Sequence, residues 1–160
     1  MHPEANKSAG KTLVNLALRI VFTLVPLSAY CQTISVQVKN DHGHTINLSS
    51  NTCNNSTCTP TPPSSVPIGA TSTPFGAVPG SGQSSPLITT KWTATVGATH
   101  YGCQFQAGAT IGVTSCGKTI SGNAYEGVFP NPGCKVTGFS QAAYPACGLT
   151  VMFDMTPSSQ

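Results

Sequence analysis

Six cysteines between positions 53 and 147 restrict the fold of this 160-residue chain more than any other feature. An even number of cysteines in a short exported domain is typical of a disulfide framework. A zinc site is the competing interpretation, but the chain has no Cys-x-x-Cys pair, and no histidine lies within its two 12-residue gaps between cysteines. We therefore expect a disulfide-stabilised domain without a metal ion or other cofactor. The six residues are Cys53, Cys58, Cys103, Cys116, Cys134 and Cys147.

The last four cysteines belong to a short internal similarity. Gly102-Cys103, twelve residues and Cys116-Gly117 recur as Gly133-Cys134, twelve residues and Cys147-Gly148. Two similar strand–loop–strand units could each be closed by their own bridge, or they could be cross-linked to one another. We expect the first arrangement, with bridges Cys103–Cys116 and Cys134–Cys147 and a local bridge between Cys53 and Cys58, although six cysteines allow 15 pairings.

The first 31 residues differ from the rest and predict a signal peptide. Two lysines precede an apolar stretch from Leu13 to Leu27, whose uninterrupted part is shorter than the roughly 20 residues of a membrane span. Cleavage after Cys31 would leave one domain, 32–160, without a transmembrane span. We expect this domain to be secreted or extracellular, which in a bacterium includes the periplasm and the cell surface. Two alternatives stay open: a lipoprotein in which Cys31 is acylated, disfavoured by the bulky Tyr30, and an uncleaved amphipathic anchor.

The predicted mature domain is nearly neutral. After position 31 it holds four lysines, no arginine and three acidic residues, spread along the chain. A nucleic-acid-binding protein needs a clustered basic face. The composition therefore argues against nucleic acid as a partner.

Alternation of apolar and polar residues predicts strands. Thr33–Lys39 has the period of two that a half-buried strand shows, and Leu87–Val96 and Leu149–Met155 also have strand character. The turn signal Asn40-Asp41-His42-Gly43 follows the first strand, since Asn, Asp and Gly tolerate a positive φ. Because Thr45–Leu48 resumes the alternation, we predict a β-hairpin around this turn.

Between these strands, the segment 49–86 is rich in Ser, Thr, Asn, Pro and Gly and contains seven prolines. Helix is excluded there and central strands are disfavoured, but short edge strands near Val66 and Phe75 are expected. Ala107-Gly108 predicts a further turn. Frequent turn signals between short strands indicate an all-β fold, a small antiparallel β-sandwich or barrel with long Pro/Gly/Ser-rich loops. We favour the sandwich.

Few residues could support catalysis. His42 and His44 could bind a metal ion from one side of a strand, but no third ligand is identifiable. A Ser–His–Asp arrangement could combine His100 with Asp154, yet no G-x-S-x-G motif is present. Glu126 and Asp154 could form a glycosidase carboxylate pair, although they are two of only three acidic residues after position 31. We therefore predict that the domain is not an enzyme.

Aromatic side chains are the candidates for ligand binding, because they stack on sugars or lie at a lipid headgroup boundary. We expect Trp92 and Phe105 to belong to the core. Tyr125 and Phe129 lie in a Gly- and Pro-rich stretch, Gly122–Gly133, which we predict to be an exposed contact loop. The predicted binding residues are Tyr101, Tyr125 and Phe129, and Tyr144 is a further candidate.

Part of the chain resembles a known family. Val-Lys-Asn-Asp-His-Gly-His-Thr-Ile-Asn-Leu at 38–48, Pro-Pro-Ser-Ser-Val-Pro-Ile-Gly at 62–69 and then Phe75 resemble the opening of aegerolysin-like and related crystal-toxin β-sandwiches. The resemblance implies a membrane-lipid-binding sandwich, sometimes a partner in pore formation. Members of that family are typically acidic with few cysteines, unlike this chain, and no site residue can be carried over.

Three functions are compatible with these features. The first is a secreted, non-catalytic binding protein that recognises a cell-surface lipid or carbohydrate. One version of this hypothesis makes the protein membrane-active. The second is a structural or adhesive surface component, pilin-like or coat-like, which an unpaired sheet edge would favour. The third is a secreted hydrolase, which would need His100 or His42 beside a carboxylate in a cleft.

Overall fold

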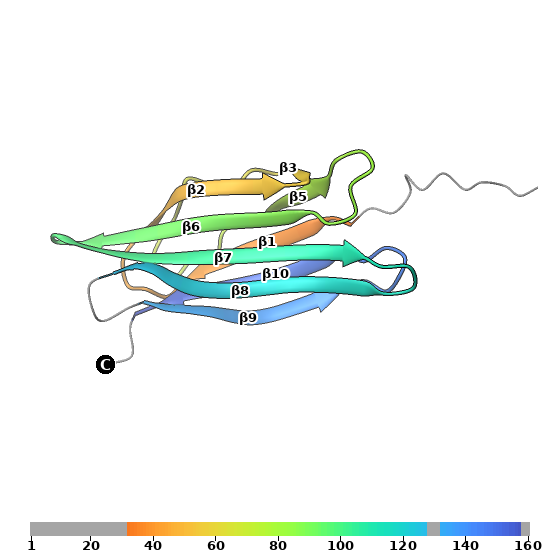
Figure 1. Ribbon diagram of the computed structural model, residues 1–160. Coiled ribbons are helices and arrows are strands. Elements are labelled where there is room, and N and C mark those ends of the chain that lie inside the picture. Colours follow the sequence, from red (N-terminus) through yellow and green to blue (C-terminus); the bar gives the residue numbers. More distant parts are fainter. Residues whose placement is uncertain (1–31, 128–131, 158–160) are drawn as a thin grey trace, which may run out of the picture.

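The computed structural model describes residues 32–127 and 132–157, so the predicted signal peptide with Cys31 lies outside the described residues. Within these ranges the chain forms ten strands and no helix (Figure 1). No helix in the described part is therefore long and apolar enough to cross a membrane. The strands are β1 (Ile34–Asn40), β2 (Ile46–Asn54), β3 (Ser56–Cys58), β4 (Ser65–Val66), β5 (Phe75–Pro79), β6 (Leu87–Val96), β7 (Thr99–Ile111), β8 (Cys116–Gly127), β9 (Gly133–Gln141) and β10 (Leu149–Thr156).

The strands form two five-stranded sheets that lie one behind the other in Figure 1. Sheet A has the order β3-β5-β1-β10-β9, and sheet B has the order β4-β2-β6-β7-β8. All strand pairs are antiparallel except β1 and β10, which run parallel in the middle of sheet A. The all-β prediction is confirmed, and the purely antiparallel one is wrong for this central pair.

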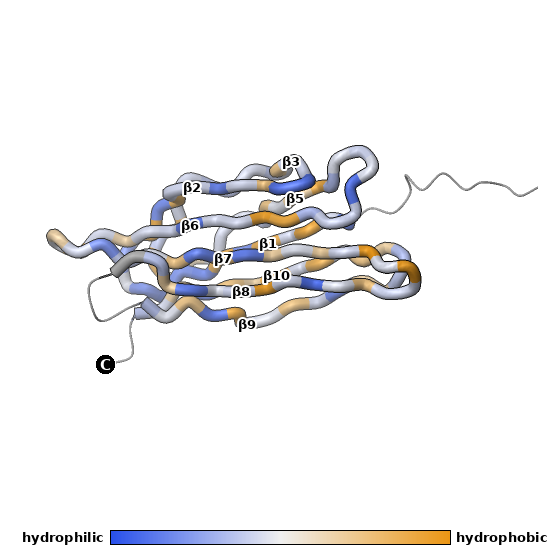
Figure 2. The backbone as a smooth tube through the Cα atoms, in the orientation of Figure 1, coloured by the Kyte–Doolittle hydropathy of each residue, from blue (hydrophilic) through white to orange (hydrophobic). Residues whose placement is uncertain are grey.

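One apolar core lies between the sheets. Along β1, along β6 as far as Ala94 and along β10 as far as Phe153, every second residue is buried, as the period of two predicts. Trp92 is fully buried, and the Phe105 ring stacks on Phe153 with 4.6 Å between centroids, so both predicted core aromatics are confirmed. Each large side chain of this kind contributes about 1.5–3 kcal/mol of transfer free energy. Figure 2 shows the apolar positions interleaved with polar ones along the strands.

The predicted hairpin at 40–43 is wrong, because its two strands belong to different sheets. Strand β1 pairs with β10 and β5, whereas β2 pairs with β6 and β4. The buried amide of Asn40 holds this crossing: its Nδ2 donates to the carbonyls of His44 (2.9 Å) and Val66 (2.8 Å), and its Oδ1 accepts from the His42 N–H (3.1 Å). The turn residues therefore build an arch between the sheets, and Gly43 supplies its positive φ of 87°.

The segment 49–86 contributes strands to both sheets. The short strands expected near Val66 and Phe75 are present as β4 and β5. Strand β5 is not an edge strand, however, since it lies between β3 and β1. Prolines do not prevent β5 from pairing on both sides, because Pro74 precedes the strand and Pro79 is its last residue. Neither proline therefore interrupts the hydrogen bonds between β5 and β1.

Gly108 marks close packing and not the turn that was predicted. Strand β7 runs without interruption through Ala107 and Gly108 to Ile111. A Cβ at Gly108 would meet Leu87 Cδ1 at 2.7 Å, so the glycine makes room for a side chain of the neighbouring strand. The turn into β7 is the two-residue connection Gly97-Ala98.

Two disulfides join a strand of sheet A to a strand of sheet B, and the third joins sheet B to the β9–β10 connection. The local bridge Cys53–Cys58 is confirmed and links β2 to β3. The other two are Cys103–Cys134, from β7 to β9, and Cys116–Cys147, from β8 to the residues just before β10. They therefore cross-link the two similar units.

The favoured pairings Cys103–Cys116 and Cys134–Cys147 are both wrong, and the first fails for a geometric reason. In the β7–β8 ladder Cys103 is opposite Ala124, whereas Cys116 is opposite Ile111. Cys116 is thus level with a residue eight positions further along β7, about 26 Å away at 3.3 Å per residue. A disulfide needs Cα atoms within roughly 7 Å. For Cys103 the bridged cysteine is Cys134 on the facing sheet, with 5.6 Å between the two Cα atoms.

Candidate binding surface

Tyr125, Lys91 and Ser49 form a cluster on the outer face of sheet B, which we call the Tyr125 cluster. Tyr125 Oη lies 2.9 Å from Ser49 Oγ, and Lys91 Nζ lies 4.8 Å from the centroid of the Tyr125 ring. Ser49 Oγ also lies 3.2 Å from the Lys91 carbonyl oxygen, to which it can donate. The three side chains come from β8, β6 and β2, so the cluster extends across the sheet.

Two β-bulges place this cluster. In the β7–β8 ladder Gly102 is opposite Glu126 and Cys103 is opposite Ala124, which leaves Tyr125 as the extra residue. In the β2–β6 ladder Leu48 is opposite Trp92 and Ser50 is opposite Lys91, which leaves Ser49 as the extra residue. A bulge re-aims its side chain relative to a regular ladder. Here both re-aimed side chains meet over β6 and β7.

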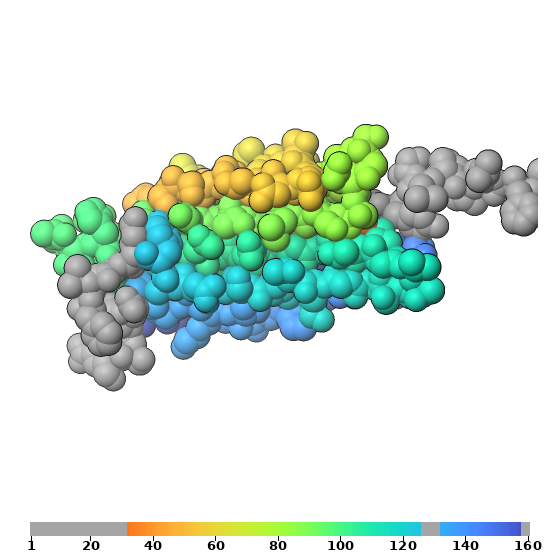
Figure 3. Space-filling model, in the orientation of Figure 1, coloured from red at the N-terminus to blue at the C-terminus, as the bar shows by residue number. Residues whose placement is uncertain are grey.

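Uncharged polar groups surround the cluster. Strand alternation places hydroxyl and amide side chains outward on β6, β7 and β8, opposite the buried residues of the same strands. Some of them bond to one another: Gln106 Nε2 donates to Thr89 Oγ1 at 3.3 Å, and Thr93 Oγ1 donates to the Asn47 carbonyl at 3.4 Å. Figure 3 views the molecule from this side, with β2, β6, β7 and β8 in front. Besides Lys91, the outward residues near the cluster include Thr89, Thr93, Gln104, Gln106, Ser121 and Asn123.

The structure separates the predicted binding residues. Tyr125 belongs to strand β8, so the predicted contact loop is in fact a strand as far as Gly127. Tyr101 is half-buried on the opposite, inner side of sheet B, and its ring packs 5.3 Å from His42. Phe129 lies outside the described residues. Tyr144 is exposed in the β9–β10 connection.

The sequence-based prediction found Tyr125 but not its two partners. Lys91 could have been noticed, because alternation along β6 places it on the face opposite the apolar Ile88 and Trp92. Ser49 has no such signal. Its position depends on the bulge, and the bulge depends on how β2 is registered against β6.

The residues considered for catalysis and metal binding lie elsewhere. Asp154 on β10 is opposite Lys39 on one side and Lys135 on the other, and Lys39 forms an ion pair with Asp41. Burial raises the pKa of Asp154, and the neighbouring charge of Asp41 raises it further. Asp154 Oδ1 is buried without a hydrogen-bond partner among the described residues.

His42 is buried in the arch, 5.9 Å from the ring of His44. Burial lowers the pKa of His42, and the charge of His44 lowers it further. In the described part of the chain, no group of three or more His, Cys, Asp or Glu side chains could hold a metal ion.

The structure does not assemble the proposed Ser–His–Asp arrangement. His100 is exposed on β7, where its Nδ1 lies 3.1 Å from Thr95 Oγ1 on the adjacent strand. Asp154 contacts the Lys39–Asp41 pair instead. For Glu126 the structure describes the backbone position opposite Gly102, and the side chain lies outside the description.

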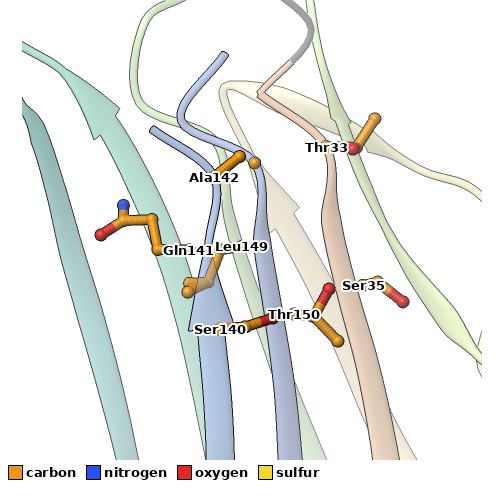
Figure 4. Close-up of a pocket in the computed structure, with 8 residues that line it drawn as sticks. Thr33, Ser35, Ser140, Gln141, Ala142, Leu149 and Thr150 are labelled. Carbon is orange, nitrogen blue, oxygen red and sulfur yellow. The ribbon is translucent and has the colours of Figure 1, made fainter. Parts of the chain in front are cut away.

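An open hollow of about 410 Å³ lies on the outer face of sheet A, around the start of β10 (Figure 4). Ser35, Thr150 and Ser140 are in register across β1, β10 and β9, so three hydroxyls form a row along its floor. Its lining residues include no aromatic and no charged side chain. The hollow offers hydrogen bonds alone, which makes it a weaker candidate than the Tyr125 cluster.

No protein-family model matches the chain, and no curated protein matches it either. The resemblance of residues 38–75 to aegerolysin-like sandwiches therefore stays a prediction.

Proposed function

We propose that the chain is an exported, non-catalytic recognition protein that binds cell-surface carbohydrate through the outer face of sheet B. The observation that carries this proposal is the Tyr125 cluster: two bulges bring Ser49 and Tyr125 together beside Lys91. Bulges are enriched next to functional sites, where they orient side chains.

The chemistry of this face suits a sugar. Hydroxyl and amide side chains can exchange hydrogen bonds with sugar hydroxyls, and an aromatic ring can pack against the apolar face of a sugar ring. The ladders of sheet B and the inter-sheet disulfides hold these groups in place, so binding needs little ordering of the protein.

Export is supported by the disulfides. Three bridges are present, and disulfides persist in oxidising environments such as the extracellular space and the bacterial periplasm. Together with the predicted signal peptide, they favour a protein that works outside the cytoplasm.

A glycan array probed with the oxidised protein tests the proposal. We expect saturable binding to a subset of glycans, and a loss of at least about tenfold in affinity for Tyr125→Ala, which removes the ring and its bond to Ser49. Tyr144→Ala is the matched control, because it removes an exposed aromatic from another surface. The proposal fails if the folded protein binds no glycan, or if both variants lose affinity equally.

A second candidate function, docking on a lipid surface, rests on a different observation. The β7–β8 turn (112–115) and the β9–β10 connection (142–148) contain no charged residue and no histidine. Val113 on the first is 91% exposed and Tyr144 on the second is 45% exposed. Figure 2 shows apolar colour where β7 turns into β8.

The disulfide Cys116–Cys147 ties these two connections together at one end of the sandwich. The chain also enters the domain at this end, since the Leu149 N–H donates to the Thr33 carbonyl at 2.9 Å. An uncharged, rigid end with exposed Val and Tyr suits the boundary between headgroups and acyl chains.

Sedimentation with phosphatidylcholine vesicles tests this second candidate. Val113→Asp should abolish binding. Ile68→Asp should not, because Ile68, which is 60% exposed, lies near the distant arch. Its neighbour Gly69 donates its N–H to the Asn40 carbonyl there. Equal behaviour of the two variants would refute lipid docking by this end.

A further inference from the structure

The charge at the Tyr125 cluster indicates which sugars the face selects. Lys91 is the only charged side chain that the structure describes among the outward residues of β6, β7 and β8. Asp41 and Asp154, in contrast, gather around Lys39 on sheet A. The Lys91 ammonium thus stands in a hydroxyl and amide surface without an ion-pair partner among the described residues.

The Lys91 ammonium is also held in a defined place. Its Nζ lies over the Tyr125 ring, which the hydrogen bond to Ser49 ties to β2. A cation held by an aromatic ring keeps N–H donors for a further partner, because the ring accepts through its π face alone. A positioned ammonium among neutral donors and acceptors is complementary to an anionic group attached to a hydroxyl-rich molecule.

We propose that the outer face of sheet B selects acidic sugars, with Lys91 as the residue that binds the carboxylate or sulfate. This inference rests on the proposed carbohydrate-binding function and specifies its ligand class. A neutral sugar would leave the Lys91 ammonium without a charged partner, whereas an acidic sugar would gain a charge-assisted hydrogen bond.

The molecule contains a matched control for this interaction. Lys118 Nζ lies 4.9 Å from the centroid of the Phe139 ring, almost the same geometry as Lys91 over Tyr125. Lys118 belongs to β8 but approaches β9 of the other sheet, so it is outside the proposed face. Replacing each lysine by methionine removes the same charge from two different surfaces.

The experiment compares paired glycans that differ only in one anionic group: sialylated and uronic-acid glycans, sulfated glycans, and their neutral parents. We expect the oxidised full chain to bind an acidic member at least about tenfold more tightly than its neutral parent, and the preference to weaken with added salt. Lys91→Met should abolish the preference and Lys91→Arg should retain it. Lys118→Met should change affinity by less than twofold.

The outcomes separate this inference from the function on which it rests. Equal binding of acidic and neutral glycans, or the same loss in Lys118→Met as in Lys91→Met, would overturn the acidic preference and leave carbohydrate binding intact. Absence of binding to every glycan would overturn both. A carboxylate-only or sulfate-only response identifies which anion Lys91 accepts and supports the inference in either case.

Discussion

Ser49 and Tyr125 are 76 residues apart in sequence, yet their hydroxyl oxygens lie 2.9 Å apart. Each is the extra residue of a β-bulge, one in the β2–β6 ladder and one in the β7–β8 ladder. Two irregularities on strands that do not pair with one another therefore coincide on a single face of sheet B. A regular ladder would have aimed these side chains differently, so the bulges create the contact.

A double-mutant cycle should measure this contact directly. Ser49→Ala and Tyr125→Phe each remove one hydroxyl and keep the remaining shape of the side chain. We expect a coupling energy of about 0.5–1 kcal/mol from urea unfolding of the two single variants and the double variant, as for a partly exposed hydrogen bond. Strictly additive losses would show that the two hydroxyls do not interact in solution.

The disulfides should differ in their contribution to stability according to the loops they close. Cys103–Cys134 spans 31 residues and Cys53–Cys58 spans five. The chain-entropy model gives roughly 4 kcal/mol for the first and roughly 2 kcal/mol for the second. Paired Cys→Ala variants followed by guanidinium unfolding check the order, and a larger loss from the short bridge would contradict it.

Asn40→Ala should destabilise the domain by about 2–4 kcal/mol. The substitution leaves the His44 and Val66 carbonyls and the His42 N–H without their amide partner, and buried groups left unpaired are costly. Asn51→Ala, at an exposed position on β2, is the control and should change stability by less than about 0.5 kcal/mol. If thermal unfolding shows similar stability for both variants, Asn40 does not hold the arch.

Stability should decrease on mild acidification because of His42. Its pKa is lowered from the ordinary value of 6.5 by burial and then by the charge of His44. Between pH 6.5 and the lowered pKa, the unfolded chain therefore binds more protons than the folded protein. The free energy of unfolding consequently decreases as the pH is lowered through this range. His42→Phe should flatten this slope in urea titrations, whereas His100→Phe at an exposed position should retain it.

Asp154 should produce a slope of the opposite sign at lower pH. Burial and then Asp41 raise its pKa above 3.8, so the folded protein binds more protons than the unfolded chain between 3.8 and the raised value. Stability from this group is therefore greatest below pH 3.8 and is lost as the pH rises through the raised pKa. Measured in the His42→Phe background, Asp154→Asn should remove that dependence. An unchanged profile would contradict the assignment.

Local patterns predicted the strands well and their partners poorly. The alternation in β1, β6 and β10 reflects burial of one face, which each strand encodes by itself. The Asn-Asp-His-Gly turn is compatible with a hairpin or an arch, and the choice depends on the distant Val66 carbonyl that Asn40 binds. In the same way, Cys103 could be paired correctly only by knowing that β9 lies across the core from β7.

The residues of the candidate site likewise differ in whether the local sequence could predict them. Tyr125 could be singled out because an aromatic residue in a polar stretch is a local feature. Its partner Ser49 could not, because many serines precede the core strands and only the register of β2 against β6 distinguishes this one. Residues that act through long-range register leave little local trace in a single sequence.

The parallel pairing of β1 with β10 constrains when the domain can fold. The last strand lies between β1 and β9 in the middle of sheet A, so that sheet stays divided until residues 149–156 are available. A chain that is threaded across a membrane from its N-terminus could therefore not complete sheet A during transit. The long-range bridges Cys103–Cys134 and Cys116–Cys147 would then be fixed by oxidation after arrival, once both sheets are complete.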